Sequence, residues 1–147
     1  MRRIESYEAM LDLGSEIAKH LKIGDLVVLT GELGAGKTAL TQGIGRELGI
    51  TGITSPTFVI SRSHNGKIPL NHVDAYRLLQ SANATLEFED LDLGANLESS
   101  ITVIEWGSEV APILKDEFLE IKIAFDGDGA RLVEAVSHGD RWQGFRL

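Results

Sequence analysis

One eight-residue segment has the residue types and spacing of a phosphate-binding loop. It reads Gly31-Glu32-Leu33-Gly34-Ala35-Gly36-Lys37-Thr38 and matches the pattern G-x-x-x-x-G-K-[ST]. Glycines let successive backbone N–H groups point inward at an anion, and a following helix adds the positive end of its dipole. Lys37 can reach the β- and γ-phosphates of a nucleotide, and the Thr38 hydroxyl can bind Mg²⁺. The segment therefore predicts a site for a nucleoside triphosphate with Mg²⁺.

A Mg²⁺ ion at such a loop needs a further ligand, a carboxylate at the carboxyl end of a neighbouring strand. Two residues qualify: Glu105 follows the apolar run 101–104, and Asp74 follows residues 68–73, where Pro69 indicates an edge strand or a strand start. The residues alone leave open which of the two contacts the metal. Thr57 lies in a loop beyond the P-loop helix, where a hydroxyl could complete the metal's ligands and sense the γ-phosphate.

The residues near Asp74 favour adenine over guanine as the base. Asn71-His72-Val73-Asp74 is superficially like the guanine-reading motif N-K-x-D, but His72 stands where that motif has lysine. Trp106, next to Glu105, is placed either to cover the site or to fill the core. The histidines show no metal-ligand spacing, and we interpret all of them as structural or surface residues; they are His20, His64, His72 and His138.

Hydrophobic periodicity and turn signals predict the elements that position these residues. Helices are expected from the Ser6 cap to about Leu21 and from Lys37 to Leu48, where Gly49 is suited to end the helix. The first helix should bury one stripe, consisting of Met10, Leu13, Ile17 and Leu21. Strands buried on both faces are predicted over 26–30 and 101–104.

Two strand pairs and two less regular segments complete the pattern. Strands 58–60 and 68–73 should join through Asn65-Gly66, a strong hairpin signal. Strands 119–125 and 131–136 should form a closing hairpin across Asp126-Gly127-Asp128-Gly129, which lacks the spacing of a calcium loop. Residues 76–98 are ambiguous, and 108–114 reads as a short helix broken near Pro112.

The order helix, strand, P-loop, helix and then strands predicts an α/β fold. We expect a P-loop NTPase-like sandwich with a mixed, mainly parallel central sheet, flanked by helices and closed by the C-terminal β-hairpin. A chain of 147 residues fits one P-loop ATPase domain over residues 1–147. No run approaches the roughly 18 apolar residues of a membrane span, and no signal-peptide stretch follows Met1. Together with the absence of cysteine, this predicts a cytoplasmic protein.

The charge balance argues against direct, tight binding of nucleic acid. The formal net charge is −8, and no Lys/Arg cluster offsets the longest charge run, which is acidic and consists of Glu87, Glu89, Asp90 and Asp92. Proteins that grip RNA or DNA by themselves usually present a basic face, because neutralising phosphates supplies most of the affinity. Any contact with nucleic acid is therefore expected to come through a partner.

Taken together, the ordered segments resemble the TsaE family, formerly YjeE, of small bacterial ATPases required for threonylcarbamoyladenosine (t⁶A) modification of tRNA. Their order and spacing agree over nearly the whole chain. The segments are Leu11-Asp12-Leu13-Gly14, the loop Gly31–Thr38, Ser55-Pro56-Thr57-Phe58, His72-Val73-Asp74-Ala75-Tyr76-Arg77-Leu78, Leu86-Glu87-Phe88 and Ile104-Glu105-Trp106.

The resemblance implies an ATPase that works with two partners, TsaB and TsaD. TsaD carries the threonylcarbamoyl transfer to adenosine 37 of tRNA, so this chain would meet tRNA indirectly. By the same resemblance, Thr38 and Glu105 bind Mg²⁺, Asp74 positions or activates water, and Thr57 belongs to a switch-like loop. Trp106 lies beside the active site.

The resemblance also implies that Tyr7, Met10 and Arg131 approach the nucleotide away from the γ-phosphate. One departure from the family is visible, because the residue after Thr38 is usually a second threonine and here is Ala39. A hydroxyl contact to the α-phosphate is therefore missing, and backbone N–H groups can take its place.

Two other functions fit a P-loop and stay open at this stage. A small-molecule kinase normally has several arginines in a lid, whereas here the arginines after the loop are scattered: Arg46, Arg62, Arg77, Arg131, Arg141 and Arg146. A nucleotide-dependent binding switch with negligible turnover is the other alternative. None of these arginines is marked as an arginine finger, although Arg77 follows Asp74 closely, so we expect slow hydrolysis without partners.

Overall fold

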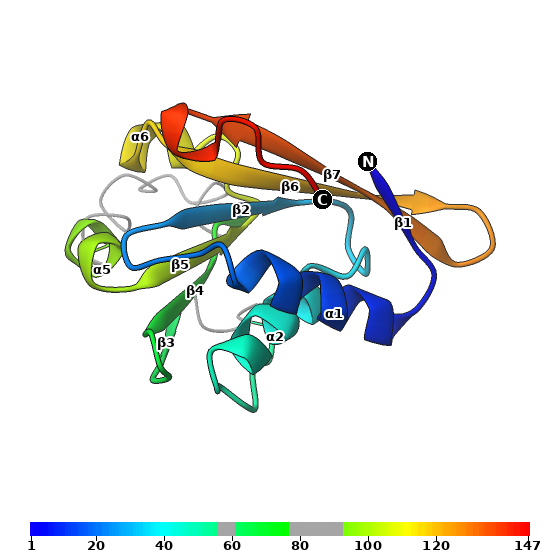
Figure 1. Cartoon of the computed structure of the whole chain (residues 1–147), viewed down its shortest axis with the longest axis horizontal. Helices are drawn as coiled ribbons and strands as arrows, with labels where there is room; N and C mark the ends of the chain where they lie inside the picture. Colours follow the sequence, from blue (N-terminus) through cyan, green and yellow to red (C-terminus); the bar gives the residue numbers. More distant parts are fainter. Residues whose placement is uncertain (56–60, 77–92) are drawn as a thin grey trace.

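A mixed β-sheet forms the centre of the molecule in the computed structural model, which describes residues 1–55, 61–76 and 93–147 (Figure 1). The strands of these residues run in the order β1-β7-β6-β2-β5-β4-β3. The middle strands β6, β2, β5 and β4 are parallel to one another, and the outer pairs are antiparallel. Their bounds are β1 Arg2–Ile4, β2 Leu26–Thr30, β3 Ser61–His64, β4 Leu70–Asp74, β5 Ile101–Glu105, β6 Phe118–Asp126 and β7 Ala130–His138. The expected sheet, mixed and parallel at its centre, is confirmed.

The central strand β2 is buried because both of its faces are apolar. Val27 and Leu29 join one hydrophobic cluster, and Leu26 and Val28 join a second cluster on the opposite face. All four side chains are fully buried. Packing on both faces therefore holds β2 in place, and with it the start of the loop that follows.

Helices cover both faces of the sheet. Helices α1 (Tyr7–Ala18) and α2 (Lys37–Glu47) lie together on one face (Figure 1). Residues of α5 (Leu93–Ser99) and α6 (Ala111–Leu114) pack into the second cluster. The side chain of Ser6 caps α1 by accepting a hydrogen bond from the backbone N–H of Ala9, as a serine at this position commonly does. The predicted stripe is buried, which confirms this helix, but α1 ends at Ala18, so Leu21 follows it and was placed on it wrongly.

Two glycines let α1 and α2 touch backbone to backbone. A Cβ added to Gly14 would lie 2.3 Å from the carbonyl oxygen of Leu40, and one added to Gly43 would lie 2.1 Å from that of Leu11. The Ser15 hydroxyl donates a hydrogen bond of 2.9 Å to the carbonyl of Gly43 across the same contact. Helix α2, which carries the end of the P-loop, is thus fixed tightly against α1.

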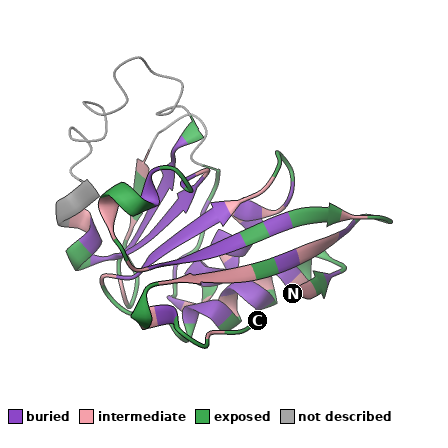
Figure 2. Cartoon of the chain, turned by 90° about the horizontal axis from the view of Figure 1, so that it is seen from above, coloured by how far each residue is buried: buried purple, intermediate pink, exposed green. Residues whose placement is uncertain are grey.

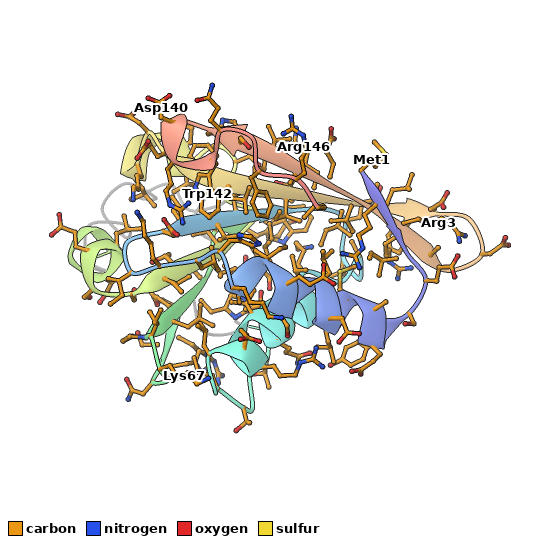
Figure 3. The ribbon with its side chains drawn as sticks, in the orientation of Figure 1. Met1, Arg3, Lys67, Asp140, Trp142 and Arg146 are labelled. Carbon is orange, nitrogen blue, oxygen red and sulfur yellow. The ribbon has the colours of Figure 1, made fainter. Side chains whose placement is uncertain are left out.

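The closing hairpin is confirmed and is longer than predicted. Strands β6 and β7 pair from Phe118 with His138 to Asp126 with Ala130, and Asp128 and Gly129 turn the chain with φ of 60° and 83°. The outer end of this hairpin is exposed, whereas the centre of the sheet is buried (Figure 2). Beyond it, Trp142 lies inside the molecule in a 3₁₀ helix (Asp140–Trp142) that was not expected (Figure 3).

Other local expectations need correction. The hairpin of β3 and β4 is present, but residues 65–69 connect the strands, so Asn65-Gly66 is not a two-residue turn. Residues 58–60 lie outside the described part. Pro112 sits in the first turn of α6 and does not break it, because that turn needs no N–H from proline. The short strand β1 was also missed, since the only element predicted near the start of the chain is the helix that Ser6 caps.

Among the described helices, none is long and apolar enough to cross a membrane.

Candidate nucleotide and metal site

The loop Gly31–Thr38 occupies the position that its motif predicts. It connects the carboxyl end of β2 to the first residues of α2 (Figure 1). Gly34 and Gly36 have φ of 78° and 113°, values that residues with side chains rarely adopt. Ala35 is fully buried between them and anchors the loop to the core. The strand–loop–helix context required of a phosphate-binding loop is therefore present.

Arg131, on β7, braces this loop from outside. Its Nε donates a hydrogen bond of 3.1 Å to the carbonyl of Ala35, and a terminal nitrogen donates one of 3.3 Å to the carbonyl of Gly34. The guanidinium carbon lies 4.4 Å from the ring centre of Phe125. These hydrogen bonds tie the backbone of the loop to β7.

The Lys37 side chain lies folded inside the loop. Its Nζ donates hydrogen bonds to the carbonyls of Gly31 (2.8 Å) and Glu32 (2.9 Å), and it lies 4.3 Å from the ring centre of Trp106. Burial lowers the pKa of Lys37, and the negative charges of nearby Glu105 and Asp74 partly counteract that decrease. A cation in such a water-poor place interacts strongly with phosphate oxygens.

The two candidate carboxylates lie side by side at the ends of parallel strands. Asp74 and Glu105 are register partners of β4 and β5, and they are 5% and 4% exposed. The hydroxyl of Thr38 donates a hydrogen bond of 3.3 Å to Oε1 of Glu105. Oδ1 of Asp74 accepts a hydrogen bond of 2.9 Å from the backbone N–H of Tyr76. The structure thus brings together the three residues predicted to surround the metal.

His72 is a site residue that sequence reasoning missed. It is fully buried, and its Nε2 lies 2.9 Å from Oε1 of Glu105. Burial excludes the surface alternative predicted for His72 and leaves the structural one, but its contact with Glu105 was not expected. Strand alternation could have found it, since residues two apart on β4 share a face and place His72 beside Asp74.

Trp106 adopts a backbone conformation that is uncommon for a bulky residue. Its φ is 62°, in the left-handed region, and its N–H donates to the carbonyl of Leu29 at 3.0 Å. Its ring lies 5.3 Å from that of Tyr76, and both residues line the cavity at the loop. Strained residues of this kind cluster at functional sites.

A buried carboxylate on β6 ties the Trp106 turn to the P-loop strand. Glu120 Oε1 accepts hydrogen bonds of 3.1 Å each from Thr30, at the end of β2, and from Ser108, two residues past Trp106. His138 lies 3.2 Å from its other oxygen. Burial alone would raise the pKa of Glu120, but these hydrogen bonds outweigh it and hold the pKa below the ordinary value.

Two cavities open on either side of the loop and share Gly34 and Gly36. The first, of about 450 Å³, is lined by the loop together with Lys37, Thr38, Ser55, Asp74, Tyr76, Glu105 and Trp106. The second, of about 300 Å³, is lined by Tyr7, Met10, Ala39 and Arg131, among others. The residues expected near the γ-phosphate and those expected away from it therefore lie at different ends of one loop.

Some predicted residues lie outside the described part of the chain. These are Thr57, Arg77 and the acidic residues 87–92.

The donor set fits Mg²⁺. It offers the hydroxyl of Thr38 and the carboxylates of Glu105 and Asp74, and Mg²⁺ takes oxygen ligands. In residues 1–55, 61–76 and 93–147, no group of three His, Cys, Asp or Glu side chains could hold a metal by itself. A usual Mg²⁺ site has one or two carboxylates that act together with substrate phosphates and water.

The fold and this loop define a protein of the P-loop class, which implies nucleotide binding. A family model described as "Threonylcarbamoyl adenosine biosynthesis protein TsaE" matches residues 4–133. The chain belongs to the TsaE family.

Individual relatives agree with this assignment. A protein from Streptomyces coelicolor named "tRNA threonylcarbamoyladenosine biosynthesis protein TsaE" is 46% identical over 141 residues, which cover 90% of this chain and 93% of that protein. The Bacillus subtilis protein of the same name is 38% identical, with 86% and 78% covered. A crystal structure of Bacillus subtilis YdiB superposes with a TM-score of 0.75 at 30% identity and covers 97% of this chain and 87% of that one.

Proposed function

We propose that this chain is the Mg²⁺-dependent ATPase component of the t⁶A machinery, acting in the cytoplasm with TsaB and TsaD. One observation carries the proposal: Lys37, Thr38, Asp74 and Glu105 meet at one cavity of a P-loop. The chain's family supplies the pathway. A sheet that draws strands from both ends of the chain supports a single P-loop domain over residues 1–147.

Each residue at the γ-phosphate end has a role that its position supports. Thr38 and Glu105 would hold Mg²⁺, which neutralises charge on the β- and γ-phosphate oxygens when bound. Lys37 would exchange its bonds to the loop carbonyls for bonds to phosphate oxygens, and Trp106 would cover it. Asp74, oriented by the N–H of Tyr76, would position the attacking water or accept its proton.

The other end of the loop would hold the nucleoside. Tyr7, Met10, Ala39 and Arg131 surround the second cavity, and we propose that adenine and ribose lie there. Thr57 is proposed to approach the γ-phosphate from the segment that follows Ser55, a residue of the first cavity.

Three of the six arginines after the loop have partners of their own, which supports slow hydrolysis by the chain alone. Arg46 forms ion pairs with Glu8 and Asp12, and Arg141 forms one with Asp25. Arg131 donates to the loop carbonyls. An arginine finger is worth roughly 10³ to 10⁵ in rate, so we propose that TsaB and TsaD raise turnover. Residues 87–92 are proposed as an acidic docking segment, whose binding should weaken with salt.

Steady-state ATPase assays test the proposal. They compare the chain alone with the chain plus TsaB, TsaD and tRNA, at low and high salt. We expect slow turnover alone and a clear, salt-sensitive rise with the partners. Full turnover in isolation that the partners leave unchanged would contradict the proposal. Transfer of phosphate to a small acceptor molecule would instead identify a kinase.

A further inference from the structure

The chemistry of His72 and Glu105 determines which of the two donates the hydrogen bond between them. An ionised carboxylate can only accept hydrogen bonds, so Nε2–H of His72 donates a hydrogen bond to Oε1 of Glu105 over 2.9 Å. Thr38 donates to the same oxygen over 3.3 Å. Both donors therefore act on one oxygen of the carboxylate, and neither of these bonds occupies Oε2.

His72 is itself held in place by the sheet. It lies in the middle of β4, paired with Arg62 of β3 on one side and with Val103 of β5 on the other, and it is fully buried. Its Nδ1 is also buried and has no hydrogen-bond partner among the described residues. Burying a polar ring costs free energy unless its hydrogen bonds compensate for it. The hydrogen bond between Nε2 and Glu105 supplies that compensation for one of the two ring nitrogens.

Glu105 needs such a restraint because an alternative partner is near. Lys37 lines the same cavity, and the negative charge of Glu105 acts on it. A glutamate free to turn could pair with the ammonium group of Lys37. That pairing would draw the carboxylate away from a metal at Thr38 and the lysine away from phosphate.

We propose that His72 is a positioning residue that fixes Glu105 in the orientation in which its carboxylate, with Thr38, binds Mg²⁺. This inference rests on the proposed function. Hydrogen-bond partners of metal ligands orient them, and losing such a partner typically lowers metal affinity 10- to 100-fold. His72 would therefore set the Mg²⁺ requirement of the site without touching the nucleotide.

The test measures ATP binding by calorimetry in a Mg²⁺ titration and again with the metal chelated. His72→Leu should raise the Mg²⁺ concentration at half-saturation by about tenfold or more, with metal-free ATP affinity unchanged within about twofold. His72→Gln, whose amide can donate from nearly the same place as Nε2, should restore most of the metal affinity. Thr38→Ala, which removes a ligand, should resemble His72→Leu, and His20→Leu serves as a matched control at an exposed histidine.

The outcomes separate this inference from the proposed function. If the unaltered chain binds no ATP with or without Mg²⁺, the proposed function fails and the inference falls with it. If the unaltered chain binds Mg·ATP and His72→Leu has the same Mg²⁺ requirement, only the role of His72 is overturned. An equal loss of metal-free binding would also overturn it, as it would mean general distortion. Should His72→Leu not fold, His72→Asn carries the same expectation, because its amide is too short to reach Glu105.

Discussion

Replacing Gly43 by alanine should displace the helix that carries the P-loop lysine and threonine. The added Cβ would lie 2.1 Å from the carbonyl oxygen of Leu11 and 2.9 Å from its Cα, where ordinary contact begins near 3.4 Å. Both opposing atoms belong to the backbone of α1, so no side chain can turn aside. Helices α1 and α2 must therefore separate by about 1 Å or more.

The expected loss of stability follows from two opposing effects. Overpacking of a tight contact typically costs about 1–3 kcal/mol, and a clash with backbone belongs at the upper end or beyond. Alanine gains up to about 1 kcal/mol over glycine in a helix interior. The net loss is then about 2 kcal/mol, which for a chain of this size lowers Tm by roughly 6–8 °C.

The same displacement should reach the site. Gly43 lies six residues beyond Lys37 on α2, and the Thr38–Glu105 hydrogen bond joins this helix to β5. A shift of about 1 Å at a reacting centre can cost as much as 10²-fold in rate, so we expect turnover of Mg·ATP to fall by at least about tenfold.

Thermal unfolding and ATPase assays check this prediction together. Gly127→Ala is the matched control, since its Cβ would meet no described atom within 4 Å and Gly127 is not in the left-handed region. It should leave both Tm and turnover close to those of the parent. A Gly43→Ala variant that melts within about 1 °C of the parent would refute the reasoning, because the helices could then separate at no cost.

Three further predictions concern ionisable residues. Bound triphosphate should raise the lowered pKa of Lys37, so ATP affinity should fall as pH rises through that pKa, beginning below the ordinary value of 10.5. Calorimetry over a pH series checks this, and Lys37→Arg should abolish the dependence of ATP affinity on pH in that range. Glu105→Ala should shift the Mg²⁺ titration of ATP hydrolysis more than Asp74→Ala does, whereas the reverse order would exchange their roles. Because the pKa of Glu120 is lowered, the carboxylate stabilises the fold at pH values above its ordinary pKa of 4.5, and this stabilisation is lost as pH falls through the pKa of the folded state. The free energy of unfolding in urea should therefore depend less on pH in that range for Glu120→Gln than for the parent. An unchanged dependence would contradict the prediction.

The sequence predicted the parts of the site that depend on local order. The loop motif needs only a buried strand before it and a helix after it, and both are present. Asp74 and Glu105 each end an apolar run, and parallel strands bring such ends to one edge of a sheet. Their meeting with Thr38 therefore follows from the fold class, although the roles of the three residues stay predictions.

Contacts that depend on distant segments could not be predicted in the same way. Gly14 and Gly43 show no local signal, because a glycine inside a helix pattern merely looks unfavourable until the second helix is in place. The hydrogen bonds of Arg131 to the loop carbonyls span 96 or 97 residues of the chain. Strand β1 has three residues, too few to show an alternation of apolar and polar side chains. It forms because it can pair with β7 at the edge of the sheet. His72 differs, since its strand position would have placed it beside Asp74.

Restoration of t⁶A synthesis tests the central claim most directly. The mixture contains TsaB, TsaD, tRNA, ATP, Mg²⁺ and the threonylcarbamoyl donor, and lacks only this chain; t⁶A in digested tRNA is measured by mass spectrometry. Adding the chain should restore t⁶A, and adding Lys37→Ala should not, because that variant lacks the charge that meets the phosphates. Full restoration by Lys37→Ala, or none by the unaltered chain, would contradict the account.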